Sequence, residues 1–100
     1  MDQLKKIARN TFVTISFVGD SEMKKLNKKY RNKDYPTDVL SFDIDEKTDD
    51  DKFYLGDIAV NIEQAERQAG KFGNTLQEEV SALVAHGMLH LQGVHHKGDD

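Results

Sequence analysis

The chain has 100 residues, a formal net charge of −4 and no cysteine. This length predicts a single domain with a thin core, because a chain of this size buries only roughly 60% of the surface that its unfolded form exposes. The lack of cysteine excludes disulfides and thiolate metal ligands and suits a reducing compartment. The polar N-terminus is unlike a signal peptide, and no apolar run is long enough to cross a membrane. We therefore expect a cytoplasmic protein with no membrane association.

Charge is distributed unevenly along the chain. Residues 22–33 are rich in lysine and arginine, whereas residues 43–51 are rich in aspartate and glutamate. The negative net charge of the whole chain does not indicate nucleic-acid binding. A local basic face can nevertheless bind an anion, because screening at physiological salt acts over about 8 Å. Both runs can equally be solvated surface.

The first half of the chain predicts a strand, a helix and a second strand. Residues 11–18 alternate, with Val13, Ile15 and Phe17 on the side expected to be buried. Asp20 or Ser21 is expected to cap the following helix, and Pro36 ends that region. Residues 38–44 read as the second strand.

The second half predicts a third strand and two helices. Residues 53–62 form the strand, which an exposed acidic hairpin loop connects to the second strand. Asn61 is expected to cap a helix over roughly 62–71. A capping box at Thr75–Glu78 begins the last helix, which should run to about Gln92 before Gly93 ends it. This order predicts an α+β fold, with a small mixed or antiparallel sheet packed with helices.

All four histidines of the chain lie between residues 86 and 96. His86 and His90 are one helical turn apart, so their side chains can reach one ion. Gly93 turns the backbone, and His96 can return toward the same point. The pattern H-x3-H-x2-G-x2-H matches the metzincin zinc motif, except that Gly87 replaces the glutamate that acts as general base. The sequence therefore predicts a zincin-like metal helix near the C-terminus.

Three neutral imidazoles would leave Zn²⁺ its full charge and an open position for water. Such an ion lowers the pKa of water to about 7 and polarises substrate oxygens, which suits an anionic phosphodiester. Gly87 supplies no proton acceptor for peptide hydrolysis, although hydrolysis of another bond stays an alternative. The general base is unassigned.

Three ordered blocks of the sequence carry a family resemblance. They are LNKKYRNKDYPTDVLSF (26–42), LGDIAVN (55–61) and HGMLHLQGVHH (86–96). Together they resemble the YbeY family of metal-dependent, single-strand-specific endoribonucleases of ribosomal RNA maturation. The chain departs from the family pattern at Asp43, Val94 and His95. We expect residues 1–100 to form a single YbeY-like metallohydrolase domain that is shortened at both ends.

The resemblance implies a set of site residues and partners. One Zn²⁺ per chain would be bound by His86, His90 and His96, and Arg31 would act in catalysis. The substrate would be single-stranded RNA, including ribosomal RNA. The protein would be a monomer, and the ribosome would be its partner. RNA-binding residues would be Lys28, Lys29, Arg31 and Tyr35.

Several assignments keep an alternative. Asp57 and His95 are expected to support the metal ligands rather than to react. Arg31 could instead form a surface ion pair with Asp34 or Asp38. The whole chain could be a non-catalytic, ribosome-associated zinc module, with a fourth ligand from His95, Asp99 or Asp100. Among aromatic residues, Tyr35 is the expected base-stacking residue, whereas Phe42, Phe53 and Tyr54 are expected to pack.

Overall fold

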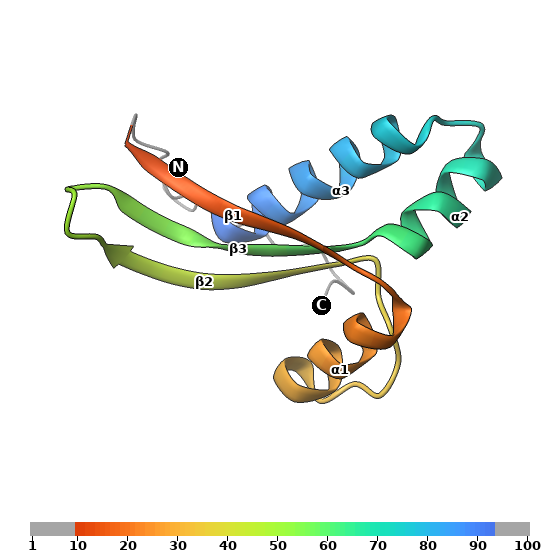
Figure 1. Cartoon of the computed structure of the whole chain (residues 1–100), viewed down its shortest axis with the longest axis horizontal. Helices are drawn as coiled ribbons and strands as arrows, with labels where there is room; N and C mark the ends of the chain where they lie inside the picture. Colours follow the sequence, from red (N-terminus) through yellow and green to blue (C-terminus); the bar gives the residue numbers. More distant parts are fainter. Residues whose placement is uncertain (1–9, 94–100) are drawn as a thin grey trace.

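The computed structural model describes residues 10–93, which form a three-stranded sheet and three helices (Figure 1). In chain order the elements are β1 (Thr11–Val18), α1 (Asp20–Arg31), β2 (Val39–Lys47), β3 (Phe53–Asn61), α2 (Ile62–Phe72) and α3 (Leu76–Leu91). The sheet order is β1-β3-β2, with β1 parallel and β2 antiparallel to β3. The expected α+β class with a mixed sheet is confirmed. No helix in this range is long and apolar enough to span a membrane.

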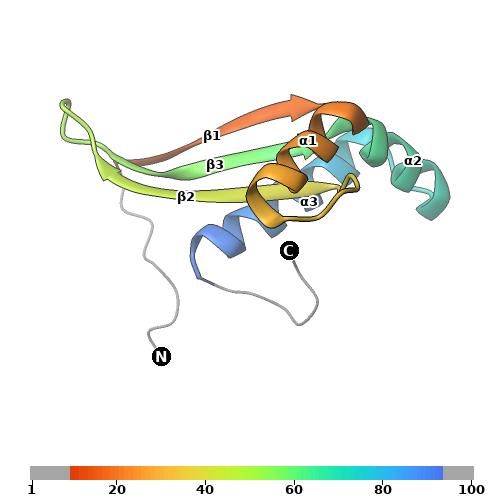
Figure 2. The same cartoon turned by 90° about the horizontal axis from the view of Figure 1, so that it is seen from below.

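Helices cover the two faces of the sheet unequally. α3 packs along β2 and β3 on one face, whereas α1 lies across one end of the opposite face (Figure 2). Side chains alternate along each strand, so two separate cores form. The core beneath α3 contains Val39, Leu55, Ile58, Val60, Ala65, Leu83 and Leu91. The smaller core beneath α1 contains Met23, Leu40 and Ala59.

The alternating strand β1 is less buried than its sequence predicts. Val13 packs against the core beneath α3, but Ile15 is 40% exposed and Phe17 is 57% exposed. Ile15 and Phe17 are exposed because β1 is at the edge of the described sheet, whereas α3 packs over the other two strands. Alternation in the sequence identifies the strand correctly but does not indicate which strand the helix covers.

Helix ends follow the local signals with one exception. The Asn61 side chain accepts hydrogen bonds from the amides of Glu63 and Gln64, and the Thr75–Glu78 capping box is present. Both caps are as predicted. The cap of α1 was predicted wrongly, because Gly19 occupies the N-cap position and no side chain of that position bonds the helix. Instead, the amide of Asp20 donates to Glu63 Oε1 at 2.7 Å.

β2 extends three residues beyond the predicted strand, to Lys47. Its acidic residues Asp45 and Glu46 are exposed and lie on an edge strand, where solvent reaches their side chains. An irregularity between Asp43 and Glu46 accommodates Asp45, whose φ is 53°. The hairpin loop is correspondingly shorter than expected.

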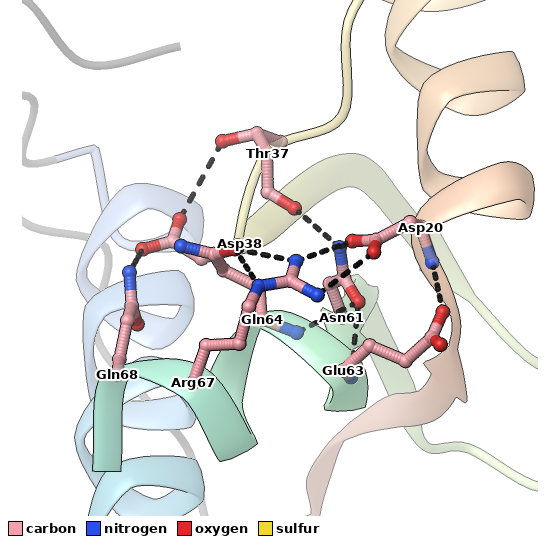
Figure 3. A network of polar contacts seen from close by, with 8 residues as sticks. All are labelled: Asp20, Thr37, Asp38, Asn61, Glu63, Gln64, Arg67 and Gln68. Atoms are coloured by element: carbon pink, nitrogen blue, oxygen red, sulfur yellow. Dashed lines mark hydrogen bonds and ion pairs between the residues drawn. The ribbon is translucent and has the colours of Figure 1, made fainter. Parts of the chain in front are cut away.

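A polar network joins the start of α1 to the segment just before β2, to the end of β3 and to α2 (Figure 3). The fully buried Asn61 donates from Nδ2 to Asp20 Oδ1 at 2.8 Å and to the Thr37 carbonyl at 3.1 Å. Arg67 of α2 donates to both carboxylate oxygens of Asp20, at 3.0 and 2.7 Å. These bonds lower the pKa of Asp20, with the Arg67 hydrogen bond as the largest cause. The network fixes the first turn of α1, the helix that ends at Arg31.

Candidate active site

His86 and His90 lie on adjacent turns of α3, with ring centroids 4.5 Å apart and planes at 67°. His90 is buried at 7% exposure, and His86 is half-buried. The predicted i, i+4 pairing is therefore present in the helix. His95 and His96 lie outside the described residues. Within residues 10–93, no group of three or more potential metal-ligating side chains gathers.

Gly87, between the two histidines, faces the sheet. A Cβ atom added at this position would lie 2.8 Å from Cγ2 of the fully buried Ile58. Any side chain would therefore push α3 away from β3. From the sequence, Gly87 was noted as replacing the general base of the metzincin motif. The structure adds a packing reason, because the helix approaches the sheet closely where the histidines flank this glycine.

Arg31 is the last residue of α1 and reaches the edge strand β2. Its Nη2 donates to the carbonyl oxygen of Ser41 at 2.6 Å, and its guanidinium lies 5.5 Å from the Phe42 ring centroid. Among the described residues, the alternative ion pair with Asp34 or Asp38 is not formed. Asp34 pairs with Lys24 at 3.9 Å, and Asp38 accepts from Gln68 at 3.3 Å.

Ser41 connects Arg31 to the histidine helix. Its hydroxyl donates to the Gly87 carbonyl at 3.2 Å, while its own carbonyl accepts the Arg31 bond. Ser41 is 6% exposed, so both bonds are sheltered from water. The hydrogen-bond partner of its hydroxyl is 46 residues away, and no local pattern indicates it.

The other predicted RNA contacts lie on or after α1. Lys28 and Lys29 are exposed, and Lys29 Nζ lies 5.1 Å from the Tyr30 ring centroid. Tyr35 is 52% exposed, and its carbonyl accepts a 2.8 Å bond from Asn27 Nδ2. Nothing in the described structure pairs these lysines with an acid. They present a basic surface next to Arg31.

Asp57 lies away from the histidine pair. Neighbouring Ile58 packs beneath α3, so Asp57 is on the α1 side of the sheet. Its carboxylate accepts a hydrogen bond from the Tyr54 hydroxyl, which raises the pKa of Tyr54 above its usual value of 10.0. A supporting role toward His86 or His90 does not fit this placement. Any relation to His96 falls outside the described residues.

A family model described as "Endoribonuclease YbeY" matches residues 1–100. The chain belongs to the YbeY family. This confirms the resemblance drawn from the three sequence blocks. The endoribonuclease YbeY of Pelotomaculum thermopropionicum is 42% identical over 92 residues, covering 88% of this chain and 60% of that protein. The endoribonuclease YbeY of Aquifex aeolicus is 44% identical over 88 residues, covering 88% and 58%.

A solved relative supports the same fold. The solution structure of a Thermotoga maritima protein superposes with a TM-score of 0.59 at 38% sequence identity, covering 88% of this chain and 55% of that one. The chain thus spans roughly 60% of the length of the YbeY proteins named above.

Proposed function

We propose that this YbeY-family chain is a metal-dependent endoribonuclease that hydrolyses phosphodiester bonds in single-stranded RNA. Two lines support the proposal. The relatives named above are endoribonucleases by name. In addition, the same buried serine bonds both to an arginine and to the helix that carries a histidine pair, and these residue types suit such chemistry.

The shared anchor is the observation on which the proposal depends most. Arg31 comes from α1 on one face of the sheet, and His86 and His90 come from α3 on the other. Ser41, on the edge strand between them, bonds to Arg31 at 2.6 Å and to the Gly87 carbonyl at 3.2 Å. A phosphate at this edge would meet the guanidinium, whose planar donors suit two phosphate oxygens.

We propose Zn²⁺ as the cofactor, one per chain, with His86, His90 and His96 as its ligands. The donor set fits, because two imidazoles lie 4.5 Å apart between centroids on successive turns, and borderline metals such as zinc accept imidazole nitrogen. A zinc ion held there supplies Lewis acidity toward water and toward a phosphate oxygen. Partial burial of both rings limits the positions that they can adopt.

The chain's own residues would bind and orient the RNA. Arg31 holds the phosphate next to the metal ligands, Lys28 and Lys29 attract the backbone without sequence preference, and Tyr35 offers an exposed ring for stacking. We further propose a monomeric cytoplasmic protein that acts on ribosomal RNA at the ribosome. Supporting roles for Asp57 and His95 at the metal are not part of this mechanism.

Metal analysis combined with RNA cleavage tests the proposal. Wild type, His90→Ala and Arg31→Ala would be purified identically, and their zinc content and cleavage of a labelled single-stranded RNA compared. We expect His90→Ala to lose metal and cleavage together. Arg31→Ala should keep its metal and lose cleavage by about two to three orders of magnitude, as is typical when an interaction with transition-state charge is removed.

Two controls sharpen this experiment. Arg31→Lys keeps the charge but not the two-pronged geometry, so it should restore binding better than turnover. Lys71→Ala removes an exposed charge on α2, away from the site, and should cleave like wild type. Equal cleavage by wild type and His90→Ala would assign the activity to a contaminant and refute the proposed function.

A further inference from the structure

The sheet face that carries α1 contains a pocket of about 610 Å³ beside the helix. Six of the residues that line it matter to the argument: Thr14 and Ser16 from β1, Tyr30 and Arg31 from α1, Phe42 from β2 and Asp57 from β3. α1 covers only one end of this face (Figure 2), and Thr14 and Ser16 are exposed. The volume falls within the range of about 300–1,000 Å³ that is typical of small-ligand sites.

Arg31 brings positive charge to this pocket, and Asp57 brings negative charge together with Asp43; Arg31 and Asp57 do not pair with each other. The guanidinium bonds the Ser41 carbonyl and lies over the Phe42 ring. No lysine or arginine in residues 10–93 forms an ion pair with Asp57. Its described polar contact is the hydroxyl of Tyr54. A half-buried carboxylate with remaining acceptor capacity therefore faces a cavity whose rim carries an arginine.

Two aromatic rings, Tyr30 and Phe42, line this pocket. Tyr30, 50% exposed, meets Phe42 edge-to-face with centroids 5.1 Å apart. Outside the pocket lining, Phe12 is 37% exposed and stacks on Tyr54, the residue that bonds to Asp57, with ring centroids 4.7 Å apart. Phe53 and Phe42 pack as expected from the sequence, but Tyr54 is directed to this open face rather than to a core. Exposed aromatics on a sheet beside a basic group are a common platform for single-stranded RNA bases.

We infer that this sheet-face pocket binds a nucleobase of the RNA, with Asp57 selecting guanine. The inference rests on the proposed function and adds a base subsite to it. A carboxylate presents two acceptors, and guanine offers two adjacent N–H donors, N1–H and the 2-amino group. Uracil has a single N–H donor, so it cannot satisfy both oxygens. Tyr54 donates to Asp57 and holds the carboxylate toward the pocket.

The arrangement of the strand follows from these contacts. The base lies on the α1 face of the sheet near Asp57, and the phosphate next to it lies at the β2 edge near Arg31. From there the backbone continues toward α3 and the histidine pair, which Ser41 links to Arg31. Asp57 thus acts as a specificity residue for the base and takes no part in the hydrolysis.

Equilibrium binding tests this inference separately from cleavage. Short uridine oligoribonucleotides with one central guanosine, inosine or adenosine would be titrated with the protein in the presence of a metal chelator, so that no turnover occurs. Inosine lacks only the 2-amino group of guanosine. We expect wild type to bind the guanosine oligomer at least about fivefold more tightly than either other oligomer.

Asp57→Asn should abolish that preference, so that the three oligomers bind with affinities within about twofold of one another. The NH2 group of asparagine is a donor, and it would face one of the two N–H donors of guanine without accepting a hydrogen bond. Tyr54→Phe should reduce the preference partially. Asp49→Asn removes one negative charge from the exposed hairpin loop and should strengthen binding of all oligomers alike without changing their ranking. Urea unfolding of each variant would verify that it is folded.

The outcomes separate the two proposals. Guanosine preference that Asp57→Asn abolishes supports the subsite, even if the protein cleaves no RNA and the proposed function fails. Cleavage without base preference, or a preference that Asp57→Asn leaves intact, overturns the subsite and leaves the proposed function standing. The subsite would also be overturned if Asp57→Asn bound RNA like wild type, while lysine-rich peptides bound to wild type and not to Asp57→Asn. That result would assign the carboxylate to a cationic protein partner.

Discussion

The hydroxyl of Ser41 donates a buried hydrogen bond to the carbonyl of Gly87, 3.2 Å away, and so attaches the edge strand β2 to the helix that carries both described histidines. The carbonyl already lies within a helix, so the serine adds a second interaction at that turn. The main-chain carbonyl of Ser41 accepts the Arg31 bond, so the same residue of β2 contacts both halves of the candidate site, one through its backbone and the other through its hydroxyl.

Ser41→Ala should destabilise the protein by about 0.5–1.5 kcal/mol, the usual net value of one buried hydrogen bond. Cleavage should fall while metal content is retained, because the histidine rings remain on α3 but lose their fixed position relative to Arg31. Urea unfolding, RNA cleavage and metal analysis would measure these three quantities. Ser81→Ala, at an exposed position of the same helix, is the matched control. It should keep cleavage and metal content, and its higher helix propensity should raise stability by at most about 0.7 kcal/mol.

Gly87→Ala should destabilise the fold despite the better helix propensity of alanine. The propensity gain is about 1 kcal/mol, whereas overpacking a filled core costs about 1–3 kcal/mol. The added methyl group would come within 2.8 Å of Ile58, which is fully buried and has no room to move away. Denaturant unfolding measures the change.

Gly70→Ala is the counterpart of that experiment. Gly70 lies in α2, is exposed, and a Cβ atom there would meet nothing within 4 Å. Alanine should therefore stabilise the protein by up to about 1 kcal/mol. If both glycine variants shifted stability in the same direction, the close approach of α3 to β3 would not be what requires Gly87.

Local signals in the sequence identified each described helix and strand, although not the N-cap of α1 or the end of β2. Asn61 and the Thr75–Glu78 box satisfy amides two or three residues away, so their caps could be predicted from spacing alone. The histidine pair on α3 could be predicted for the same reason, because one helical turn separates its members. These features depend on chain geometry over a few residues.

The features that were missed depend on partners distant in sequence. The α1 amide at Asp20 is capped by Glu63, 43 residues away, and the role of Ser41 depends on a carbonyl 46 residues away. Exposure of Phe17 follows from which strands α3 covers. Asp57 was expected to support the histidine ligands, and the sequence does not indicate that it lies on the α1 side of the sheet. Such outcomes are set by how the elements pack.

Lys28→Ala should weaken RNA binding equally for all sequences and reduce the salt dependence of binding. Each phosphate that a lysine neutralises on a single strand contributes about 0.7 to the slope of log affinity against log salt. Removing the Lys28 ammonium should therefore make the slope shallower by about that amount, and Lys29→Ala should behave alike. Anisotropy titrations over a range of salt would measure it, with Lys71→Ala on α2 expected to leave the slope unchanged.

Acid should selectively weaken the contribution of Asp20 to folding. The hydrogen bond from Arg67, and then that from Asn61, lowers the pKa of the Asp20 carboxyl below its ordinary value of 3.8. Its folded pKa is thus lower than its unfolded pKa, so the stabilisation is fully present above the unfolded value and disappears as pH falls through the folded value. Asp20→Asn should therefore be less stable than wild type at neutral pH, and the gap should narrow as pH falls below about 4. Urea unfolding of both proteins across this range measures the gap. A gap that stays constant into strong acid would mean that the carboxylate charge contributes nothing to the network that fixes the start of α1.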